Sequence, residues 1–351
     1  MGGSDVPARD VPARDVPARD VPARDVPVSD VPARDVPVSD VPARDVPVSE
    51  FSGGWGSPAG RPGRLAVGIV GAGRVGAVVG AALLRAGHRV VGASGVSEET
   101  LSRIDSLMPG VPRLDVEHVV AAAKLVFLTV PDDAIAEVCA GLATLDVWRP
   151  GQIVIHCSGR HGLAALEAAA ARGAIPMAIH PAMTFTGTSL DLDRMIGATF
   201  AVTAPTAFLP IAQALVVEMG GEPLPLEDSA RPLYHAALVH GGNHVVTLVT
   251  QAAALLAAAG VEEPGRVLLP LVHASVDGAL ADAAGAVSTL TGPVVRGDAG
   301  TVAAHVAVLA HRPEALHAYR AMALATADLA LSGGRIGPVQ YADVIVALGR
   351  D

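Results

Sequence analysis

Between residues 65 and 226, short apolar segments alternate with stretches whose apolar positions recur at helical spacing. The first segment, 65–70, is continuously apolar, which is typical of a strand buried on both faces of a parallel sheet. Further strands are predicted at 88–93, 125–130, 152–156, 174–180, 199–203 and 222–226. Helices between them are predicted at 74–86, 134–143, 163–172 and 206–219. This alternation predicts an α/β domain over residues 65–227, with a doubly wound, mostly parallel sheet covered on both faces.

From residue 228 onward, the apolar positions recur at helical spacing only. Helices are predicted at 231–259, 264–283, 300–309, 313–332 and 338–348. The most apolar stretch, 245–261, is interrupted by Thr247, Thr250 and Gln251, so we interpret it as a buried helix and not as a membrane span. The pattern therefore predicts an all-α domain over residues 228–351.

Residues 5–49 consist of nine pentapeptides of the form Asp-Val-Pro-Ala-Arg or Asp-Val-Pro-Val-Ser. A proline in every fifth position removes backbone donors and blocks both helices and central strands. The valines are too sparse to form a core, and the following segment is rich in glycine and proline. We therefore expect residues 1–64 to be a disordered arm and linker.

The charge and the cysteine content of the chain limit the kinds of molecule that we expect the protein to bind. The formal net charge of −10 argues against a nucleic-acid-binding surface. Two cysteines, Cys139 and Cys157, cannot form a disulfide framework and suit a reducing cytoplasm. The chain shows no signal-peptide pattern and no cysteine spacing typical of a metal site. We expect a cytoplasmic protein that acts on a small molecule, without nucleic acid, membrane or metal.

The first predicted strand runs directly into a glycine-rich turn that opens a helix. The turn matches the pattern G-x-G-x-x-G with Gly71, Ala72, Gly73, Arg74, Val75 and Gly76. In this context Gly71 permits the tight turn, Gly73 lets a pyrophosphate approach the backbone, and Gly76 lets helix and strand pack closely. The pattern predicts a Rossmann domain that binds a dinucleotide at the helix N-terminus. The alternative is a strand-to-helix turn without a ligand.

The end of the second strand bears on the choice of cofactor. NAD-binding domains usually carry an acidic residue there for the ribose 2′-hydroxyl, but residues 92–97 read Gly-Ala-Ser-Gly-Val-Ser. With Ser94 as a donor and no carboxylate, NADP is favoured and NAD is the alternative. Arg74 either lies over the adenine or near the 2′-phosphate, or is simply solvated. Val130 and Pro131, at the end of another strand, are predicted to line the nicotinamide ribose.

Two histidines end consecutive predicted strands, where ligands bind in open α/β sheets. His156 is followed by Cys157 and Ser158, and His180 is followed by a proline. Histidine titrates in the range that a proton donor to a carbonyl or imine requires. Ser158 would bind the substrate or orient a histidine, whereas Cys157 is interpreted as a packing residue. After Pro131, Asp132 and Asp133 are interpreted as helix-capping residues.

The helical half supplies further candidates. His240 and Asn243 are three residues apart, which places them on one face of an α-helix. His235 is interpreted as facing another helix. Arg296 lies in a polar loop and either holds a substrate carboxylate bidentately or pairs with Asp298 to fix the loop.

Several of these motifs together resemble the Rossmann-like proteins whose C-terminal half is domain of unknown function 2520. The resemblance covers residues 65–351 and depends on residues 71–76, 156–159, 180–181, 243, 290–293 and 296–298. This family is similar to the 6-phosphogluconate dehydrogenase-like group, which includes ketopantoate reductase, pyrroline-5-carboxylate reductase and prephenate dehydrogenase. The resemblance implies NAD(P)-dependent oxidoreduction and a homodimer formed through the helical domain.

One departure from that group concerns catalysis. Its hydroxyacid dehydrogenases carry a lysine four residues before an asparagine; if Asn243 is that asparagine, Val239 replaces the lysine. Ser158 and His180 resemble the substrate-binding serine and histidine of prephenate dehydrogenases, which favours His180 over His156.

Together these observations predict an NADP-dependent oxidoreductase that moves a hydride between nicotinamide and a small carboxylate-bearing carbonyl or hydroxyl compound, ketopantoate-like by analogy. Asn243 and Ser158 would bind the reacting oxygen, His180 or His240 would transfer the proton, and Arg296 would hold the carboxylate. The alternative is a dinucleotide-binding regulatory or sensor protein without turnover, which the missing lysine favours.

Overall fold

The computed structural model describes residues 64–281 and 289–349. The predicted N-terminal arm lies outside the described residues, apart from its last residue, Arg64.

The described residues form a seven-stranded sheet in the order β2-β1-β3-β4-β5-β6-β7. The strands are β1 (Ala66–Val70), β2 (Arg89–Ser94), β3 (Leu125–Leu128), β4 (Ile153–His156), β5 (Ile175–Pro181), β6 (Thr199–Thr203) and β7 (Glu222–Pro225). Only β5 and β6 pair in antiparallel fashion; the other neighbours are parallel. This confirms the predicted mostly parallel α/β fold.

Helices cover both faces of the sheet, because its central strands are apolar on both sides. Along β3, Leu125 and Phe127 join one apolar cluster while Val126 and Leu128 join another. The first cluster includes residues of α1 (Arg74–Arg85), α2 (Glu98–Leu107), α6 (Leu190–Arg194) and α7 (Leu209–Glu218). The second includes residues of α3 (Val116–Ala122), α4 (Ile135–Thr144) and α5 (Glu167–Ala170).

The described residues after β7 contain helices only, as predicted. They are α8 (Arg231–Leu238), α9 (His244–Ala258), α10 (Pro264–Ala281), α11 (Ala299–Leu309), α12 (Pro313–Ser332) and α13 (Pro338–Ala347). The single helix predicted at 231–259 is interrupted by a π-helical segment, η5 (Val239–Asn243). The last strand, β7, ends at Pro225. The boundary between the two domains at residues 227 and 228 stays a prediction.

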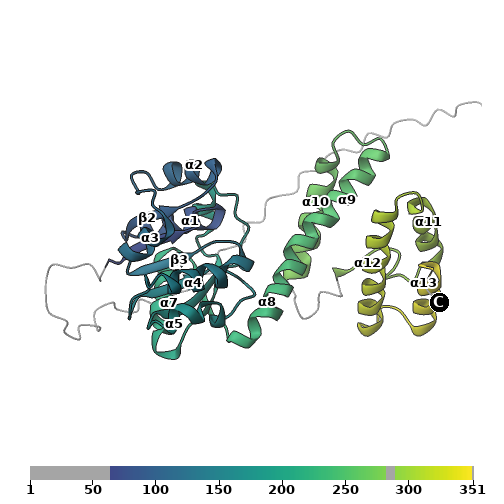
Figure 1. The fold of residues 1–351 in the computed structure, drawn as a ribbon. Helices are drawn as coiled ribbons and strands as arrows, with labels where there is room; N and C mark the ends of the chain where they lie inside the picture. Colours follow the sequence, from purple (N-terminus) through teal and green to yellow (C-terminus); the bar gives the residue numbers. More distant parts are fainter. Residues whose placement is uncertain (1–63, 282–288, 350–351) are drawn as a thin grey trace, which may run out of the picture. The chain divides into compact units, whose positions relative to one another are not determined.

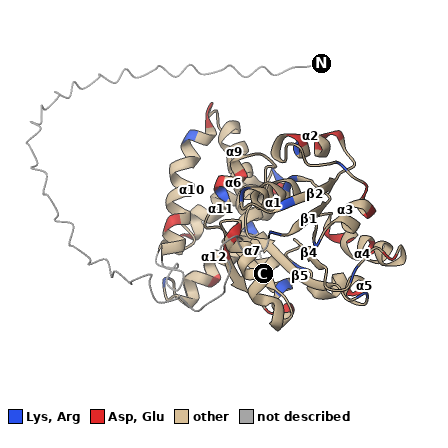
Figure 2. Ribbon diagram, turned by 90° about the vertical axis from the view of Figure 1, so that its left-hand side faces the viewer, with Lys and Arg blue, Asp and Glu red and all other residues tan. Residues whose placement is uncertain are grey.

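Helices α9 and α10 lie side by side (Figure 1). The expectation that residues 245–261 form a buried helix is wrong for a single copy of the chain, because α9 contains no buried residue. The neighbouring helix α10 buries only Leu268. Within the described residues of α9 there is no Asp, Glu, Lys or Arg, and in α10 only Arg266 and Asp277 are charged, so both ribbons are largely tan in Figure 2. No helix in the described ranges is long and apolar enough to cross a membrane.

Candidate functional site

The glycine turn after β1 is held by both neighbouring strands. Gly71 has a φ of 85° and donates its N–H to Ser94 Oγ at 3.1 Å, while Thr129 Oγ1 donates to Gly71 O at 2.8 Å. A Cβ on Gly76 would lie 2.3 Å from Thr129 Oγ1 and 2.6 Å from Gly71 O. These contacts explain why the turn needs glycine at positions 71 and 76.

Gly73 differs, because a Cβ there would meet only Gly71 O, at 4.0 Å. The fold itself therefore leaves room for a side chain, and the glycine keeps the backbone at the start of α1 open to a ligand. A cavity lies beside this turn, lined by Gly71, Gly73, Ser94, Val130 and Pro131 among others. These are five of the eight predicted cofactor-binding residues.

The remaining three predicted cofactor residues are Arg74, Val75 and Gly76, which are not among the residues that line the cavity. Arg74 is exposed, and a Cβ on Gly187 would lie 3.0 Å from its Cγ and 2.7 Å from Arg103 Nε. Arg74 and Arg103 therefore lie together over the loop between β5 and α6. Sequence reasoning did not single out Arg103.

His156 is a structural residue of the turn after β4. Ser158 N donates to His156 Nδ1 at 3.2 Å, so the proton of the neutral ring is on Nε2, which lies 3.0 Å from Gly162 O and donates to it. The ring is fully buried, and burial lowers the pKa of His156 to about 4. Both ring nitrogens are therefore occupied in a neutral histidine that closes the turn.

Ser158 connects this turn to the segment after β3. Its Oγ donates to Asp132 Oδ2 at 2.6 Å and accepts from His161 N at 3.2 Å. Asp133 forms an ion pair with Arg160. The interpretation of Asp132 and Asp133 as helix-capping residues is therefore wrong, because η1 (Asp132–Ala134) has no side-chain cap and the carboxylates bind the β4 turn instead.

His180, at the end of β5, contacts helix α8. Its Nδ1 lies 3.0 Å from Tyr234 Oη, and its ring packs edge-on against Tyr234 and His235, with centroids 5.6 and 5.9 Å away. A Cβ on Gly159 would lie 2.4 Å from His235 Cδ2 and 3.0 Å from His180 Nε2. His235 thus faces the sheet edge and not another helix. Burial, and then Arg231 and His235, lower the pKa of His180 to about 4.

Arg231, the first residue of α8, is fully buried beneath this cluster. Its Nη2 donates to Ser158 O at 2.6 Å and its Nη1 to Thr203 Oγ1 at 2.9 Å, so it joins α8 to the ends of two strands. Nε is buried without a hydrogen-bond partner in the described structure. No carboxylate of the described residues lies within 4.0 Å of the guanidinium.

A second cavity lies beside His180 and η5. His180, Met183, Thr184, His235 and Asn243 are among the residues that line it. The structure therefore brings together two predicted residues in one cavity, His180 and Asn243, and places Ser158 directly before the glycine that both histidine rings contact.

His240 and Arg296 lie apart from this lining. His240 Nδ1 is 3.0 Å from His244 Nδ1 on the exposed surface. In η5 the hydrogen bonds run from i to i+5, so a three-residue spacing does not place His240 and Asn243 on one face. Arg296 is exposed in the loop before α11, whose N-terminus is capped by Asp298 through Thr301 N and Oγ1.

Sequence reasoning missed Arg231, gave Tyr234 no role, and wrongly interpreted His235 as facing another helix. Their spacing of i, i+3 and i+4 was the available signal, because it places three polar side chains on one face of a helix.

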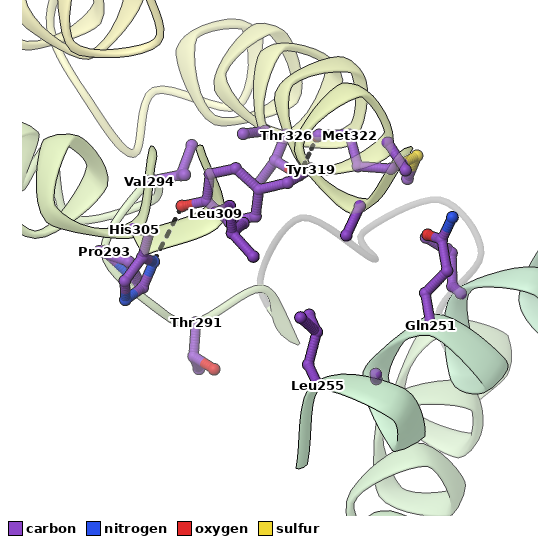
Figure 3. Close-up of a pocket in the computed structure, with 15 residues that line it drawn as sticks. Gln251, Leu255, Thr291, Pro293, Val294, His305, Leu309, Tyr319, Met322 and Thr326 are labelled. Carbon is purple, nitrogen blue, oxygen red and sulfur yellow. Dashed lines mark hydrogen bonds between the residues drawn. The ribbon is translucent and has the colours of Figure 1, made fainter. Parts of the chain in front are cut away.

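A third cavity, in the helical half, is lined mostly by apolar side chains. Figure 3 shows His305 and Tyr319 joined by a hydrogen bond of 2.9 Å, among apolar side chains such as Leu255 and Leu309. Its lining holds no Asp, Glu, Lys or Arg. We therefore place the candidate site at the sheet edge.

Comparison with known proteins agrees with this architecture. Residues 54–181 match the model of the Rossmann-like domain, and residues 198–326 match domain of unknown function 2520. The two matches follow one another along the chain in the order that the resemblance indicated. No curated protein matches the chain.

Three solved structures are similar in fold. A protein from Bacteroides fragilis named as an NADP oxidoreductase is 21% identical, with a TM-score of 0.63 over 76% of this chain and 98% of that one. An imine reductase from Pseudomonas sp. is 18% identical, with a TM-score of 0.52 over 82% and 100%. Pyrroline carboxylate reductase from Plasmodium falciparum, with NADP bound, is 12% identical, with a TM-score of 0.50 over 80% and 100%. At these identities the likeness concerns the fold.

Proposed function

We propose that the chain is an NADP-dependent oxidoreductase, with NAD as the alternative cofactor, acting on a small carboxylate-bearing carbonyl or hydroxyl compound. One observation carries the proposal: the carboxyl edge of a single sheet holds both the glycine-turn cavity and the cavity of His180 and Asn243. The open space beside Gly73 fits the pyrophosphate of a dinucleotide. The similar structures that are named as NADP oxidoreductases or hold NADP support the choice of cofactor.

A bound nicotinamide supplies or accepts the hydride. In our proposal the chain itself binds the reacting oxygen through the Asn243 amide and moves a proton at His180 Nε2, which has no hydrogen bond to any described residue. Ser158 positions the β4 turn through Asp132. Arg296 is retained for the carboxylate and His240 as the alternative proton-transfer group, although neither lines the cavity. The ketopantoate-like substrate is retained by analogy.

The helical half is proposed to form a homodimer. Helix α9 has no buried residue, and the apolar residues Val246, Leu269 and Leu271 are 67%, 59% and 62% exposed. Monomeric proteins rarely expose continuous apolar surfaces of this kind, and a second copy would supply the same uncharged helix pair. We also retain the cytoplasm as the proposed location.

The second candidate is a dinucleotide-binding sensor without turnover. Val239 favours it, because an apolar side chain lines the cavity where the related dehydrogenases have a lysine. Two measurements separate the candidates. Thermal shift with NADPH and NADH tests binding, and loss of NADPH absorbance with 2-oxo acids, ketopantoate and cyclic imines tests turnover. Stabilisation by NADPH with turnover of a 2-oxo acid is the expected result; stabilisation without turnover of any compound supports the sensor.

A further inference from the structure

Arg231 is a buried cation without a counter-ion. Its side chain has no exposed surface, its two hydrogen bonds go to uncharged oxygens, and no described carboxylate forms an ion pair with it. The two carboxylates that act electrostatically on Arg231 form hydrogen bonds with other groups, Asp132 with Ser158 and Asp228 with the N–H of Leu163. Burying an uncompensated charge is unfavourable, so a fold that retains one places a positive potential at that point.

Tyr234 lies within reach of this potential. It is one helical turn after Arg231 on α8, and its hydroxyl lies 3.0 Å from His180 Nδ1. Burial raises the pKa of Tyr234 and the charge of Arg231 acts in the opposite direction. The Tyr234 hydroxyl thus bonds to the ring that lines the cavity and is subject to the charge of the buried Arg231.

His180 is poorly suited to store a proton by itself. Arg231, His235 and His156 disfavour a second positive charge on its ring, and among the groups around it only Asp132 favours one. With a pKa of about 4, the ring is neutral at neutral pH and carries one proton. A neutral ring that accepts a hydrogen bond at Nδ1 carries that proton on Nε2, which lacks a described partner.

We propose that Arg231, Tyr234 and His180 form a proton relay in which the Tyr234 hydroxyl is the source of the proton. This inference rests on the proposed reductase function. The Nε2–H bond of His180 breaks as an O–H bond forms on the substrate oxygen, and the Tyr234 O–H bond breaks as Nδ1 gains its hydrogen. His180 therefore stays neutral, the negative charge passes to Tyr234, and Arg231 stabilises it. Solvent then protonates His180 Nε2 as the Nδ1–H bond breaks and its hydrogen returns to the Tyr234 oxygen, which restores the starting tautomer.

The relay also restricts the substrate. A fixed cation favours a reaction in which negative charge develops on the substrate, as on the oxygen of a reduced carbonyl, and disfavours a cationic iminium group. We therefore assign a ketone or aldehyde as the reacting group, in contrast to the imines of the similar imine reductase.

The effect of the Arg231 charge on Tyr234 is tested without any substrate. The chain has three tyrosines, so an alkaline titration followed by tyrosinate absorbance, compared with Tyr234→Phe, isolates Tyr234. Arg231→Gln should raise the midpoint of Tyr234 by about one pH unit or more, whereas Arg231→Lys should change it less. Arg85→Gln removes an exposed charge on α1 and is the matched control, with no change expected. An unchanged or lowered midpoint in Arg231→Gln overturns the relay; if that variant does not fold, the Arg231→Lys and kinetic results decide.

The catalytic part uses the full-length protein and whichever carbonyl compound it reduces. Tyr234→Phe should lower kcat by about 100-fold with little change in KM or NADPH binding, and should remove the alkaline limb of the kcat profile. Tyr341→Phe, which removes a hydroxyl bonded to Asp328 on α12, should retain the wild-type kcat and pH profile. Full kcat in Tyr234→Phe, or faster turnover of cyclic imines than of ketones, overturns the relay while leaving the reductase function intact. Absence of turnover with every compound refutes the reductase function and the relay's catalytic role together, and the titration then shows whether the Arg231 effect on Tyr234 exists.

Discussion

Ser158 donates its hydroxyl hydrogen to Asp132 over 2.6 Å, and this bond joins the turns that follow β3 and β4. Because the same Oγ accepts from His161 N, the side chain acts as a brace between backbone segments. We expect Ser158→Ala to lower the free energy of unfolding by about 1–3 kcal/mol, since it removes a hydrogen bond from the part-buried Asp132 carboxylate and leaves the His161 amide without its partner. Urea unfolding measures this loss. The control is Ser106→Ala, whose exposed hydroxyl bonds only its own helix, and equal stability of the two variants would contradict the role of Ser158.

Gly73→Ala separates a dinucleotide site from a ligand-free turn. The added methyl meets only Gly71 O at 4.0 Å, so the melting temperature without ligand should stay close to that of the wild type. NADPH binding should weaken at least about tenfold, because the methyl would occupy the space where backbone and pyrophosphate approach. Isothermal titration calorimetry measures the affinity. Unchanged affinity would show that the turn does not hold a pyrophosphate.

Gly159→Ala tests the histidine cluster. The new methyl would lie 2.4 Å from His235 Cδ2 and 3.0 Å from His180 Nε2, so both rings must move. We expect kcat to fall at least about tenfold, because small displacements of a proton-transfer group are costly. Gly141→Ala is the matched control: nothing lies within 4 Å of its added methyl, and alanine stabilises a helix by about 0.5–1 kcal/mol over glycine. Equal activity in both variants would show that His180 does not take part in the reaction.

Acid should destabilise the fold through His156. Its folded pKa of about 4 lies below the ordinary value of 6.5, so between these two values the unfolded chain binds the additional proton. Stability from this group is fully present above pH 6.5 and falls as pH decreases toward 4, by roughly 3 kcal/mol for a shift of this size. Urea unfolding from pH 7 to 4 measures the slope. His156→Gln should reduce it by about half, because His180, whose pKa is also lowered to about 4, contributes a similar slope. His118→Gln, which changes an exposed histidine on α3, should leave the slope unchanged.

Leu271→Glu tests the proposed dimer. Leu271 is 62% exposed on α10, and a carboxylate there would be buried against the second copy. Light scattering during gel filtration should show a monomer, whereas wild type should be a dimer. Leu190→Glu changes an equally exposed leucine on α6 and should leave the dimer intact. A monomeric wild-type chain would refute the proposal.

The sequence predicted the sheet well because burial on both faces leaves continuous apolar runs, as in β3. It missed α2, which is mostly polar and buries only Ile104, and α3, which has seven residues. Neither helix has the long apolar stripe on which the prediction of helices depends.

The candidate site was predicted in part for a similar reason. The glycine turn and the strand-end histidines are local patterns, so Gly73 and His180 could be found. Arg231 could not be recognised as buried, because an arginine at the start of a helix is usually solvated and its partners, Ser158 and Thr203, are distant in sequence. The π-helical segment likewise has no simple sequence signal, which is why His240 was expected to share a face with Asn243.

The π-helical segment η5 lies between two α-helices, α8 and α9, that follow one another without a loop. Its wider turn changes the angular phase between α8, which points polar side chains at the sheet edge, and α9, which is uncharged and carries no buried residue. In the proposed dimer, these five residues separate the helix that contacts His180 from the helix that would contact the second copy. We therefore expect substitutions on the exposed face of α9 to alter assembly without moving Tyr234 away from His180.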